Sequence, residues 1–260
     1  MCDMAKFIAI DGLDGCGKAT QSELLRKELE KRGKRVVSIS FPDYEDDSSV
    51  PVKIYLSGQL GTDASELNPY MCGSFYSIDR FIQYTKNLKP YFDEDDNTVI
   101  ISDRYLSGNI IHQCGKLDNE DERIKYIDWC YDFECNLCGM PREDITICLS
   151  MLPEVSQKLL SDRYNGDESK KDIHECNVEY LTNCYNRLQS SIEYINSGKS
   201  KAQPWVSINC YDASRQKVYS RETIHNYIMS IVDKVLNDEE IMSSELSCTS
   251  ISNDYFENEV

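Results

Sequence analysis

The sequence has no apolar run long enough to cross a bilayer, and no charged-then-apolar signal segment precedes the first apolar stretch of its N-terminus, MCDMAKFIAIDG. We therefore expect a cytoplasmic protein without a membrane partner. Basic residues are also scarce, because 28 Lys and Arg stand against 45 Asp and Glu, which gives a net charge of −17. This excess argues against broad electrostatic binding to nucleic acid, so an anionic ligand would need a local basic pocket.

Histidine is rare, and the cysteines form no pattern typical of a disulfide framework or a metal site. The three histidines, His112, His174 and His225, are scattered, and no motif places a nucleophile and an acid around any of them. The twelve cysteines are spread over a large chain, and the cluster at 130–138 has no second CxxC pair to complete a zinc site. We expect free, mostly buried thiols and no catalytic histidine.

Short apolar and β-branched runs alternate with segments of helical spacing, which predicts an α/β fold. The runs lie at 6–10, 36–41, 98–102, 145–150 and 205–209, and the first leads through a Gly-rich loop into a helix. Strands that alternate with helices in this way form a parallel sheet with helices on both faces.

The length of 260 residues fits one α/β domain with a substantial core. We assign residues 1–236 to this domain, which ends with an amphipathic helix at about 222–236. Residues 237–260 contain seven acidic residues and no Lys or Arg. We therefore expect an acidic, disordered tail there.

The loop after the first strand, GLDGCGKAT, matches the Walker A pattern G-x-x-x-x-G-K. Its glycines would turn backbone N–H groups toward a polyphosphate at a helix N-terminus, and Lys18 would reach the outer phosphates. Ala19 stands where Ser or Thr normally joins the Mg²⁺ shell, so water or a carboxylate, Asp14 or Asp103, would complete that shell. The predicted ATP-binding residues are Gly12, Leu13, Asp14, Gly15, Cys16, Gly17, Lys18, Ala19 and Thr20.

Two further segments point to a second ligand beside the phosphates. Asp103 and Arg104 end the third predicted strand, and ligands in open α/β sheets bind beyond the carboxyl ends of the strands. Asp103 could orient Mg²⁺ and Arg104 could hold a phosphate, although a lone DR pair is more simply a salt bridge. In FYSIDRF, Tyr76 and Arg80 share one helix face and could stack on a base and contact its edge. An isolated aromatic at this spacing would more often belong to the core.

Together these segments resemble the thymidylate kinase family of P-loop nucleoside monophosphate kinases, in its Gram-positive bacterial form. AIDGLDGCGKATQ, FP, FYSIDRF, SDRY and a lid-like SDRYNGDESKKDIHE at about 161–175 follow the order of the family. The resemblance implies a P-loop NTPase fold with a five-stranded parallel sheet, helices on both faces and a small lid. It also implies that ATP transfers its γ-phosphoryl group to dTMP with Mg²⁺, and that the chain forms a homodimer.

The resemblance also implies roles for individual residues. Asp14 would meet the deoxyribose 3′-hydroxyl, Tyr76 would stack on the base, Arg80 would read the thymine edge and Arg104 would hold the acceptor phosphate. The substrate-binding residues implied are Asp14, Phe41, Pro42, Tyr76, Arg80, Arg104, Ser107 and Gln113; the catalytic ones are Lys18, Asp103, Arg104, Arg163 and Lys170; the metal candidates are Asp103 and Asp14, partly through water.

Some positions depart from the family pattern. The arginine that often follows FP is absent, since Asp43, Tyr44 and Glu45 occupy that region, and Gly108 stands where Ser is usual. The lid cation could be Arg163, Lys170 or Lys171, and His174 is a candidate lid or dimer contact. Two alternatives to a dTMP kinase stay open: a related kinase for deoxynucleosides or other pyrimidine monophosphates, and a nucleotide-binding regulatory protein that has lost catalysis. A GTPase is disfavoured because no NKxD signature occurs.

Overall fold

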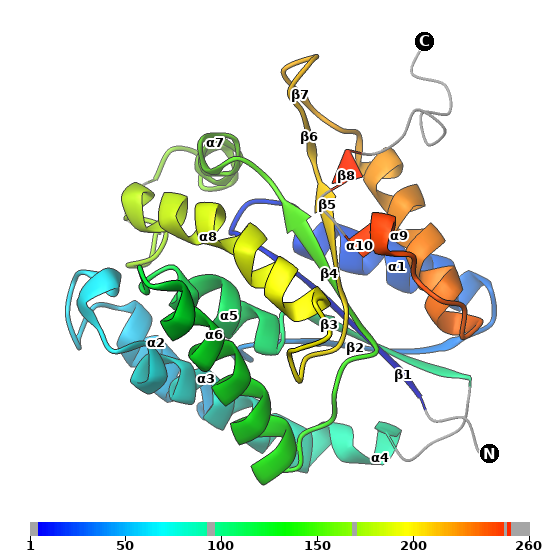
Figure 1. Ribbon diagram of the computed structural model, residues 1–260, viewed down its shortest axis with the longest axis horizontal. Helices are drawn as coiled ribbons and strands as arrows, with labels where there is room; N and C mark the ends of the chain where they lie inside the picture. The colour runs from blue at the N-terminus through cyan, green and yellow to red at the C-terminus, as the bar shows by residue number, and fades with distance from the viewer. Residues whose placement is uncertain (1–4, 93–96, 168–170, 247–248, 251–260) are drawn as a thin grey trace.

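The computed structural model describes residues 5–92, 97–167 and 171–246, and the backbone of 249 and 250. Its centre is a parallel sheet with the strand order β2-β3-β1-β4-β5-β8 (Figure 1). The five predicted strands are all present, and β8 adds a short sixth one at the edge beside β5. The strands are β1 (Lys6–Gly12), β2 (Arg35–Ser40), β3 (Thr98–Asp103), β4 (Ile145–Ser150), β5 (Trp205–Asn209) and β8 (Thr249–Ser250).

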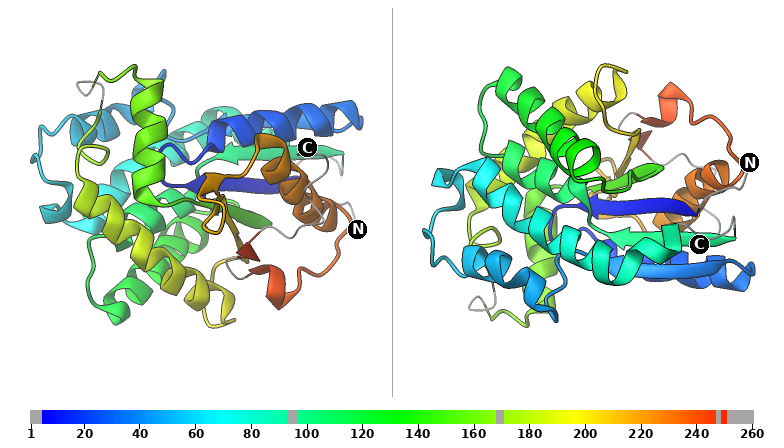
Figure 2. Two further views of the ribbon diagram at one scale, coloured as in Figure 1. Left: turned by 90° about the horizontal axis from the view of Figure 1, so that it is seen from above. Right: turned by 90° about the horizontal axis from the view of Figure 1, so that it is seen from below.

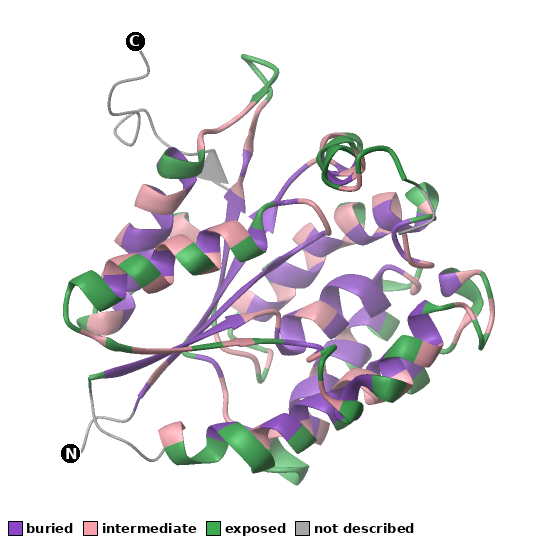
Figure 3. Cartoon of the chain, turned by 180° about the vertical axis from the view of Figure 1, so that it is seen from behind, coloured by how far each residue is buried: buried purple, intermediate pink, exposed green. Residues whose placement is uncertain are grey.

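The central strands are buried on both faces, which explains why they occur in the sequence as continuous apolar runs. Along β1, Phe7 and Ala9 pack into the core on one side of the sheet, whereas Ile8 and Ile10 pack into the core on the other. Figure 3 shows that buried residues are concentrated along the strands and the inner sides of the helices. The edge strand β2 is only partly buried.

Two groups of helices cover the opposite faces of the sheet (Figure 2). Helices α1 and α9 pack against one another over one face, and α3, α5, α6 and α8 form the layer on the other face. The helices are α1 (Lys18–Lys31), α2 (Val50–Leu56), α3 (Pro69–Gln83), α4 (Lys89–Phe92), α5 (Leu106–Cys114), α6 (Glu120–Tyr131), α7 (Pro153–Arg163), α8 (Val178–Asn196), α9 (Arg221–Leu236) and α10 (Ser243–Leu246); the short turns are η1 (Asp47–Ser49), η2 (Ala64–Glu66), η3 (Tyr84–Leu88) and η4 (Asp132–Leu137).

Several long helices begin at a side-chain cap, whereas α1, like α5 and α7, does not. The side chains of Asn68, Asn119 and Asn177 accept hydrogen bonds from the first N–H groups of α3, α6 and α8. Helix α1 instead starts after Gly17, which has a φ of 99° and provides no side-chain cap. Its first N–H groups are therefore left for a ligand, as in anion sites at helix N-termini.

The chain beyond α9 folds back against the domain rather than leaving it at residue 237. Lys234 donates to Glu245 of α10 at 2.6 Å, and the Asn196 side chain donates to the carbonyl of Leu246 at 3.2 Å. The structure therefore differs from the disordered tail predicted for these residues. These contacts and apolar packing hold the segment up to Leu246, and the two residues of β8 pair with β5. Residues 247, 248 and 251–260 of the predicted tail lie outside the described residues.

A small hairpin extends beyond the carboxyl end of the sheet, formed by β6 (Tyr211–Asp212) and β7 (Lys217–Val218) (Figure 1). The cysteines that the structure describes are free thiols, most of them buried, as the sequence indicates. Among the described helices, none combines the length and the apolar character that a membrane span requires.

Candidate active site

A cavity of about 1220 Å³ opens at the carboxyl ends of the strands. Its walls come from segments that follow β1, β2, β3, β4 and the β6–β7 hairpin, and from the region between α7 and α8. Most residues predicted from the sequence to bind ligands lie here, although distant parts of the chain contribute them. The cavity-lining residues that were predicted are Asp14, Gly15, Cys16, Gly17, Lys18, Ala19, Thr20, Phe41, Pro42, Tyr76, Asp103, Arg104 and Arg163.

The loop between β1 and α1 has a backbone that only glycine tolerates at its key positions. Gly12 has a φ of 145°, and a Cβ there would lie 2.4 Å from the Leu149 carbonyl oxygen. Gly15 has a φ of 85°, and a Cβ there would lie 2.5 Å from the Ser156 carbonyl oxygen. Gly12 and Leu13 do not line the cavity themselves, so their part is to shape the loop.

Lys18 lies over this loop and is almost fully buried. Its Nζ donates to the carbonyl oxygens of Gly12 at 3.1 Å and Leu13 at 3.0 Å, and it lies 3.7 Å from Asp14 Oδ1. The ammonium group is therefore held at the point where the free N–H groups of α1 begin. This arrangement concentrates positive charge and hydrogen-bond donors on one small area, as a phosphate site requires.

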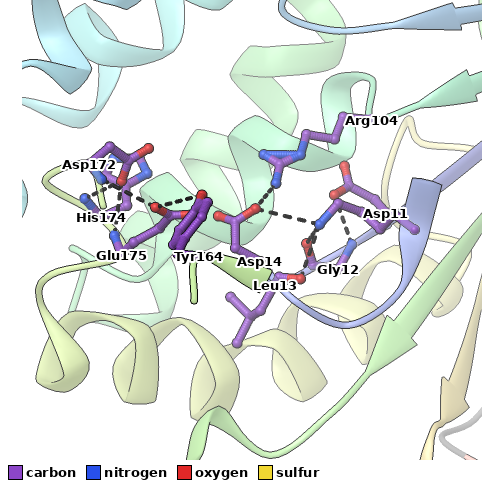
Figure 4. A network of polar contacts seen from close by, with 10 residues as sticks. Asp11, Gly12, Leu13, Asp14, Arg104, Tyr164, Asp172, His174 and Glu175 are labelled. Atoms are coloured by element: carbon purple, nitrogen blue, oxygen red, sulfur yellow. Dashed lines mark hydrogen bonds and ion pairs between the residues drawn. The ribbon is translucent and has the colours of Figure 1, made fainter. Parts of the chain in front are cut away.

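Arg104 approaches the same carboxylate from β3. Its guanidinium is ion-paired with Asp14 (Figure 4). Burial opposes ionisation of Asp14, but the charges of Arg104 and Lys18 outweigh it and lower the pKa of this carboxyl group. Arg104 has a φ of 68°, which is unusual for a residue with a side chain, and its N–H is fixed by the Ile10 carbonyl at 3.0 Å. The sheet thus holds a strained backbone that directs Arg104 into the cavity.

Asp11 is a buried carboxylate that the sequence analysis did not select. It accepts hydrogen bonds from Ser107 Oγ at 2.6 Å and from the Gly12 N–H at 2.8 Å. Burial raises the pKa of Asp11, and Arg104 and Lys18 oppose that rise. Ser107, predicted to bind substrate, is therefore turned toward Asp11 and does not line the cavity. The signal for Asp11 was its place at the end of the first strand, directly before the loop.

Arg80 is placed differently from the prediction. Arg80 is 1% exposed and does not line the cavity. It forms a bidentate ion pair with Glu134, in which Nε donates to Oε2 at 2.7 Å and Nη2 donates to Oε1 at 2.5 Å. Ser77 Oγ adds a third hydrogen bond to Glu134 at 2.7 Å. A guanidinium engaged in this way is not available to read a base edge, so the structure corrects that expectation. Gln113 is also fully buried and does not line the cavity.

The aromatic residues that were predicted to contact the acceptor lie at the cavity. Tyr76 and Phe41 both face the cavity, and Tyr76 is held by an edge contact with Tyr55, whose ring centroid lies 6.3 Å away. Tyr44, in the region where the expected arginine is missing, also lines the cavity. A base could therefore lie between aromatic surfaces, although the guanidinium expected at its edge is engaged elsewhere.

The region between α7 and α8 contributes two acids that were not predicted. Asp172 and Glu175 line the cavity across from Asp14 (Figure 4). Burial raises the pKa of Asp172 to about 7, and it also raises the pKa of Glu175. Tyr164 donates to Glu175 Oε1 at 3.2 Å.

Of the three candidate lid cations, Arg163 and Lys171 line the cavity, while Lys170 lies outside the described residues. The far end of the cavity was not anticipated either. It is lined by Val218, Tyr219, Ser220, Arg221 and Ile224, and Gln21 Nε2 donates to the Arg221 carbonyl at 3.0 Å.

The donor set around the phosphate loop suits a magnesium ion that arrives with a nucleotide. Asp14 and Asp103 both border the cavity, but the described residues contain no group of three or more His, Cys, Asp and Glu placed to hold a metal. Mg²⁺ usually keeps several waters and binds through one or two carboxylates together with substrate phosphates. Two carboxylates beside a phosphate loop match that description.

Comparisons with known proteins agree with this geometry. The family model for thymidylate kinase matches residues 10–208. The probable thymidylate kinase 1 of Saccharolobus solfataricus is 28% identical over 179 residues, which are 68% of this chain and 82% of that protein. The thymidylate kinase of Mycobacterium tuberculosis is 27% identical over 177 residues, 66% of this chain and 79% of that protein. That of Bifidobacterium longum subsp. infantis is 29% identical over 204 residues, 78% and 83% of the two chains.

A solved structure of thymidylate kinase from Candida albicans superposes on the chain with a TM-score of 0.60 at 20% sequence identity, covering 96% of this chain and 99% of that one. At this identity the likeness shows a common fold, which is the P-loop NTPase fold with helices on both faces of a parallel sheet. The family model spans well over half of the sequence, including the phosphate loop and the Asp103–Arg104 pair. The chain therefore belongs to the thymidylate kinase family.

Proposed function

We propose that the protein is an ATP-dependent dTMP kinase, which transfers the γ-phosphoryl group of ATP to dTMP and releases dTDP and ADP. One observation carries the proposal: Lys18 and Arg104 both pair with Asp14 within one cavity. Lys18 belongs to the phosphate loop and Arg104 to the end of the neighbouring strand β3. The two cations therefore mark the adjoining ends of a donor and an acceptor site.

In this proposal, binding of the two nucleotides exchanges contacts that the chain already makes. Lys18 leaves the carbonyls of Gly12 and Leu13 for the outer phosphates of ATP. Arg104 leaves Asp14 for the acceptor phosphate, which frees the carboxylate for the 3′-hydroxyl of the deoxyribose. Because phosphoryl transfer needs positioning and charge stabilisation more than covalent help, these fixed cations supply most of the catalysis.

Arg163, at the end of α7, and Lys171, between α7 and α8, would complete the positive charge around the transferred group. Lys170 and the bounds of the lid stay predictions. Asp103 and Asp14 would hold Mg²⁺, directly or through water, and the ion would neutralise charge on the phosphates of ATP. Ala19 leaves this shell without the usual hydroxyl, which gives the carboxylates a larger share.

The identity of the acceptor base is the open part of the proposal, since Arg80 is paired with Glu134. A related kinase for other pyrimidine monophosphates remains the second candidate, favoured by that pairing. Release of ADP, followed with dTMP, dUMP, dCMP, dGMP and thymidine as acceptors, decides between them. A dTMP kinase turns over dTMP fastest and leaves thymidine untouched. ATP binding without turnover on every acceptor would instead identify a regulatory protein.

We also propose that the protein forms a homodimer through α3. Met71, Ile78 and Ile82 are 41%, 40% and 36% exposed, and their spacing of seven and four residues places them along one face of the helix. Such an apolar stripe on a helix of the outer layer suits contact with the same stripe on a second copy. The cytoplasmic location also stays a prediction.

A further inference from the structure

A chain of hydrogen-bonded polar groups runs from the partly buried Lys116 through the buried Tyr55 to His174 at the wall of the cavity. Lys116 Nζ donates to Tyr55 Oη at 3.1 Å and to the Leu67 carbonyl at 3.3 Å. Tyr55 Oη and His174 Nε2 lie 2.6 Å apart. An ammonium group can only donate, so Tyr55 accepts from Lys116 and its own proton finds an acceptor in His174 Nε2. His174 is then neutral and carries its proton on Nδ1.

Aromatic rings fix the same histidine from three helices. The His174 ring stacks on His112 of α5, with centroids 5.0 Å apart and an interplanar angle of 20°. It meets Tyr55 of α2 edge-on at 5.2 Å and Tyr180 of α8 at 5.1 Å. Burial and the neighbouring His112 and Lys116 lower the pKa of His174, which agrees with a neutral imidazole at this place.

The backbone around His174 is tied to the same side of the domain. The Ile173 N–H donates to the Leu56 carbonyl at 3.3 Å, and Asn177 Nδ2 donates to Asp63 Oδ1 at 3.2 Å. Within the turn, Asp172 Oδ1 accepts from the N–H groups of His174 and Glu175 at 2.8 and 2.9 Å. The same turn therefore holds the His174 imidazole, which is 3% exposed at the cavity wall, beside the Asp172 and Glu175 side chains that line the cavity (Figure 4).

We propose that His174 is a positioning residue, which fastens the turn at 172–177 to α2 and α5 and thereby fixes the carboxylates of Asp172 and Glu175 at the acceptor half of the cavity before nucleotides bind. This segment, at the end of the predicted lid, would then be a permanent wall of the site. The effect on catalysis rests on the proposed function, whereas the fastening itself does not.

Hydrogen–deuterium exchange of the full-length, nucleotide-free protein tests the fastening directly. His174→Phe keeps an aromatic ring but removes the acceptor for Tyr55, while His174→Gln returns an acceptor near the same position. We expect exchange in a peptide over 172–177 to become about five- to tenfold faster in His174→Phe, the change expected for one buried hydrogen bond. His174→Gln should recover most of the protection, and peptides of α9 should not change.

Tyr55→Phe removes the hydroxyl oxygen at the other end of the same hydrogen bond, so it should accelerate exchange as much as His174→Phe does. This second variant keeps the test valid if His174→Phe folds poorly. The matched control is Tyr194→Phe, which loses a hydroxyl bond of 2.8 Å to Asp128, a residue that does not line the cavity. It should leave the 172–177 peptide unchanged. Unaltered exchange in both His174→Phe and Tyr55→Phe would overturn the proposal.

Steady-state kinetics then measure how the attachment of the 172–177 turn affects the reaction. We expect His174→Phe to raise the KM for dTMP about fivefold with kcat and the KM for ATP within about twofold, because the acceptor wall is loosened and the phosphate loop is not. Equal losses in the use of both nucleotides would contradict an acceptor-side role. If the wild-type protein proves inactive on dTMP, the proposed function fails while the exchange experiment still decides the role of His174.

Discussion

The guanidinium of Arg104 and the carboxylate of Asp14 form an ion pair at the meeting point of β1 and β3, within the same cavity as Lys18. Arg104 is thus paired with the carboxylate of Asp14, and a phosphate group could replace this carboxylate. Asp14 offsets the cost of holding this partly buried guanidinium, and in the proposed function an acceptor phosphate would take over that role. In the proposed function, Arg104 would therefore respond to the acceptor nucleotide.

Arg104→Ala should therefore abolish most of the use of the monophosphate while sparing ATP. We expect kcat/KM for dTMP to fall by about 10²–10³, the range seen when one charged group that stabilises the transition state is removed. The Kd for ATP should change by no more than about threefold. Steady-state rates and calorimetric ATP titrations measure both quantities, with Arg26→Ala on the outer surface of α1 as control. Equal losses for the two nucleotides would refute the assignment.

Gly12→Ala should destabilise the fold itself, because the new methyl group would meet the Leu149 carbonyl oxygen at 2.4 Å in a backbone with a φ of 145°. We expect the free energy of unfolding to fall by about 2–4 kcal/mol in urea titrations. Gly33 is the matched control, since it has a φ of 83° but no neighbouring atom within 4 Å of the place that a methyl group would take. Gly33→Ala should cost only about 1 kcal/mol. Similar losses at both sites would show that strain alone, and not the contact, explains the effect.

The features that the sequence predicted well are those whose residues lie next to one another along the chain. The phosphate loop is one contiguous segment, and Asp103 and Arg104 lie at the carboxyl end of a buried apolar strand, so the parallel sheet brings them to the edge where ligands bind. The central strands were likewise visible because burial on both faces requires continuous apolar runs.

The features that it missed depend on contacts between distant segments. Arg80 meets Glu134 across 54 positions, and Ser107 meets Asp11 across 96. No local sequence pattern predicts either pair, because these side chains come into contact only when distant segments pack together. Asp172 was missed for a similar reason, because an acid in a polar loop looks solvent-exposed until the turn carries it into the cavity.

The raised pKa of Asp172 predicts a characteristic dependence of stability on pH. With a folded-state pKa of about 7, well above the ordinary value of 3.8, the native state holds a proton that the unfolded chain releases. This group therefore makes stability fall as the pH rises from about 4 to about 7, by at most about 1.4 kcal/mol per pH unit. Asp172→Asn should remove that part of the slope, measured by urea titrations at a series of pH values. An unchanged slope, or the same change in the exposed Asp162→Asn control, would argue against it.

The proposed dimer predicts that charge on the α3 stripe separates the subunits. Ile78→Lys places a positive charge at the centre of the stripe, where it would face a second copy of itself across a twofold interface. Light scattering coupled to size-exclusion chromatography should give the mass of a dimer for the wild type and of a monomer for Ile78→Lys. Val178→Lys is the control, because Val178 is 52% exposed on α8, outside the stripe. A wild-type monomer would end the proposal.

The pair of Arg80 and Glu134 predicts a large loss of stability rather than a change of substrate. Both side chains are buried, and Glu134 also accepts from Ser77, so Glu134→Gln would leave the guanidinium of Arg80 without its counter-charge. Removing one member of a buried pair costs about 3–5 kcal/mol, and we expect a loss of that size in urea titrations. Glu193→Gln on the exposed part of α8 is a control that should change stability by less than about 0.5 kcal/mol. If Glu134→Gln instead keeps its stability and alters the preference among dTMP, dUMP and dCMP, Arg80 reads the base after all.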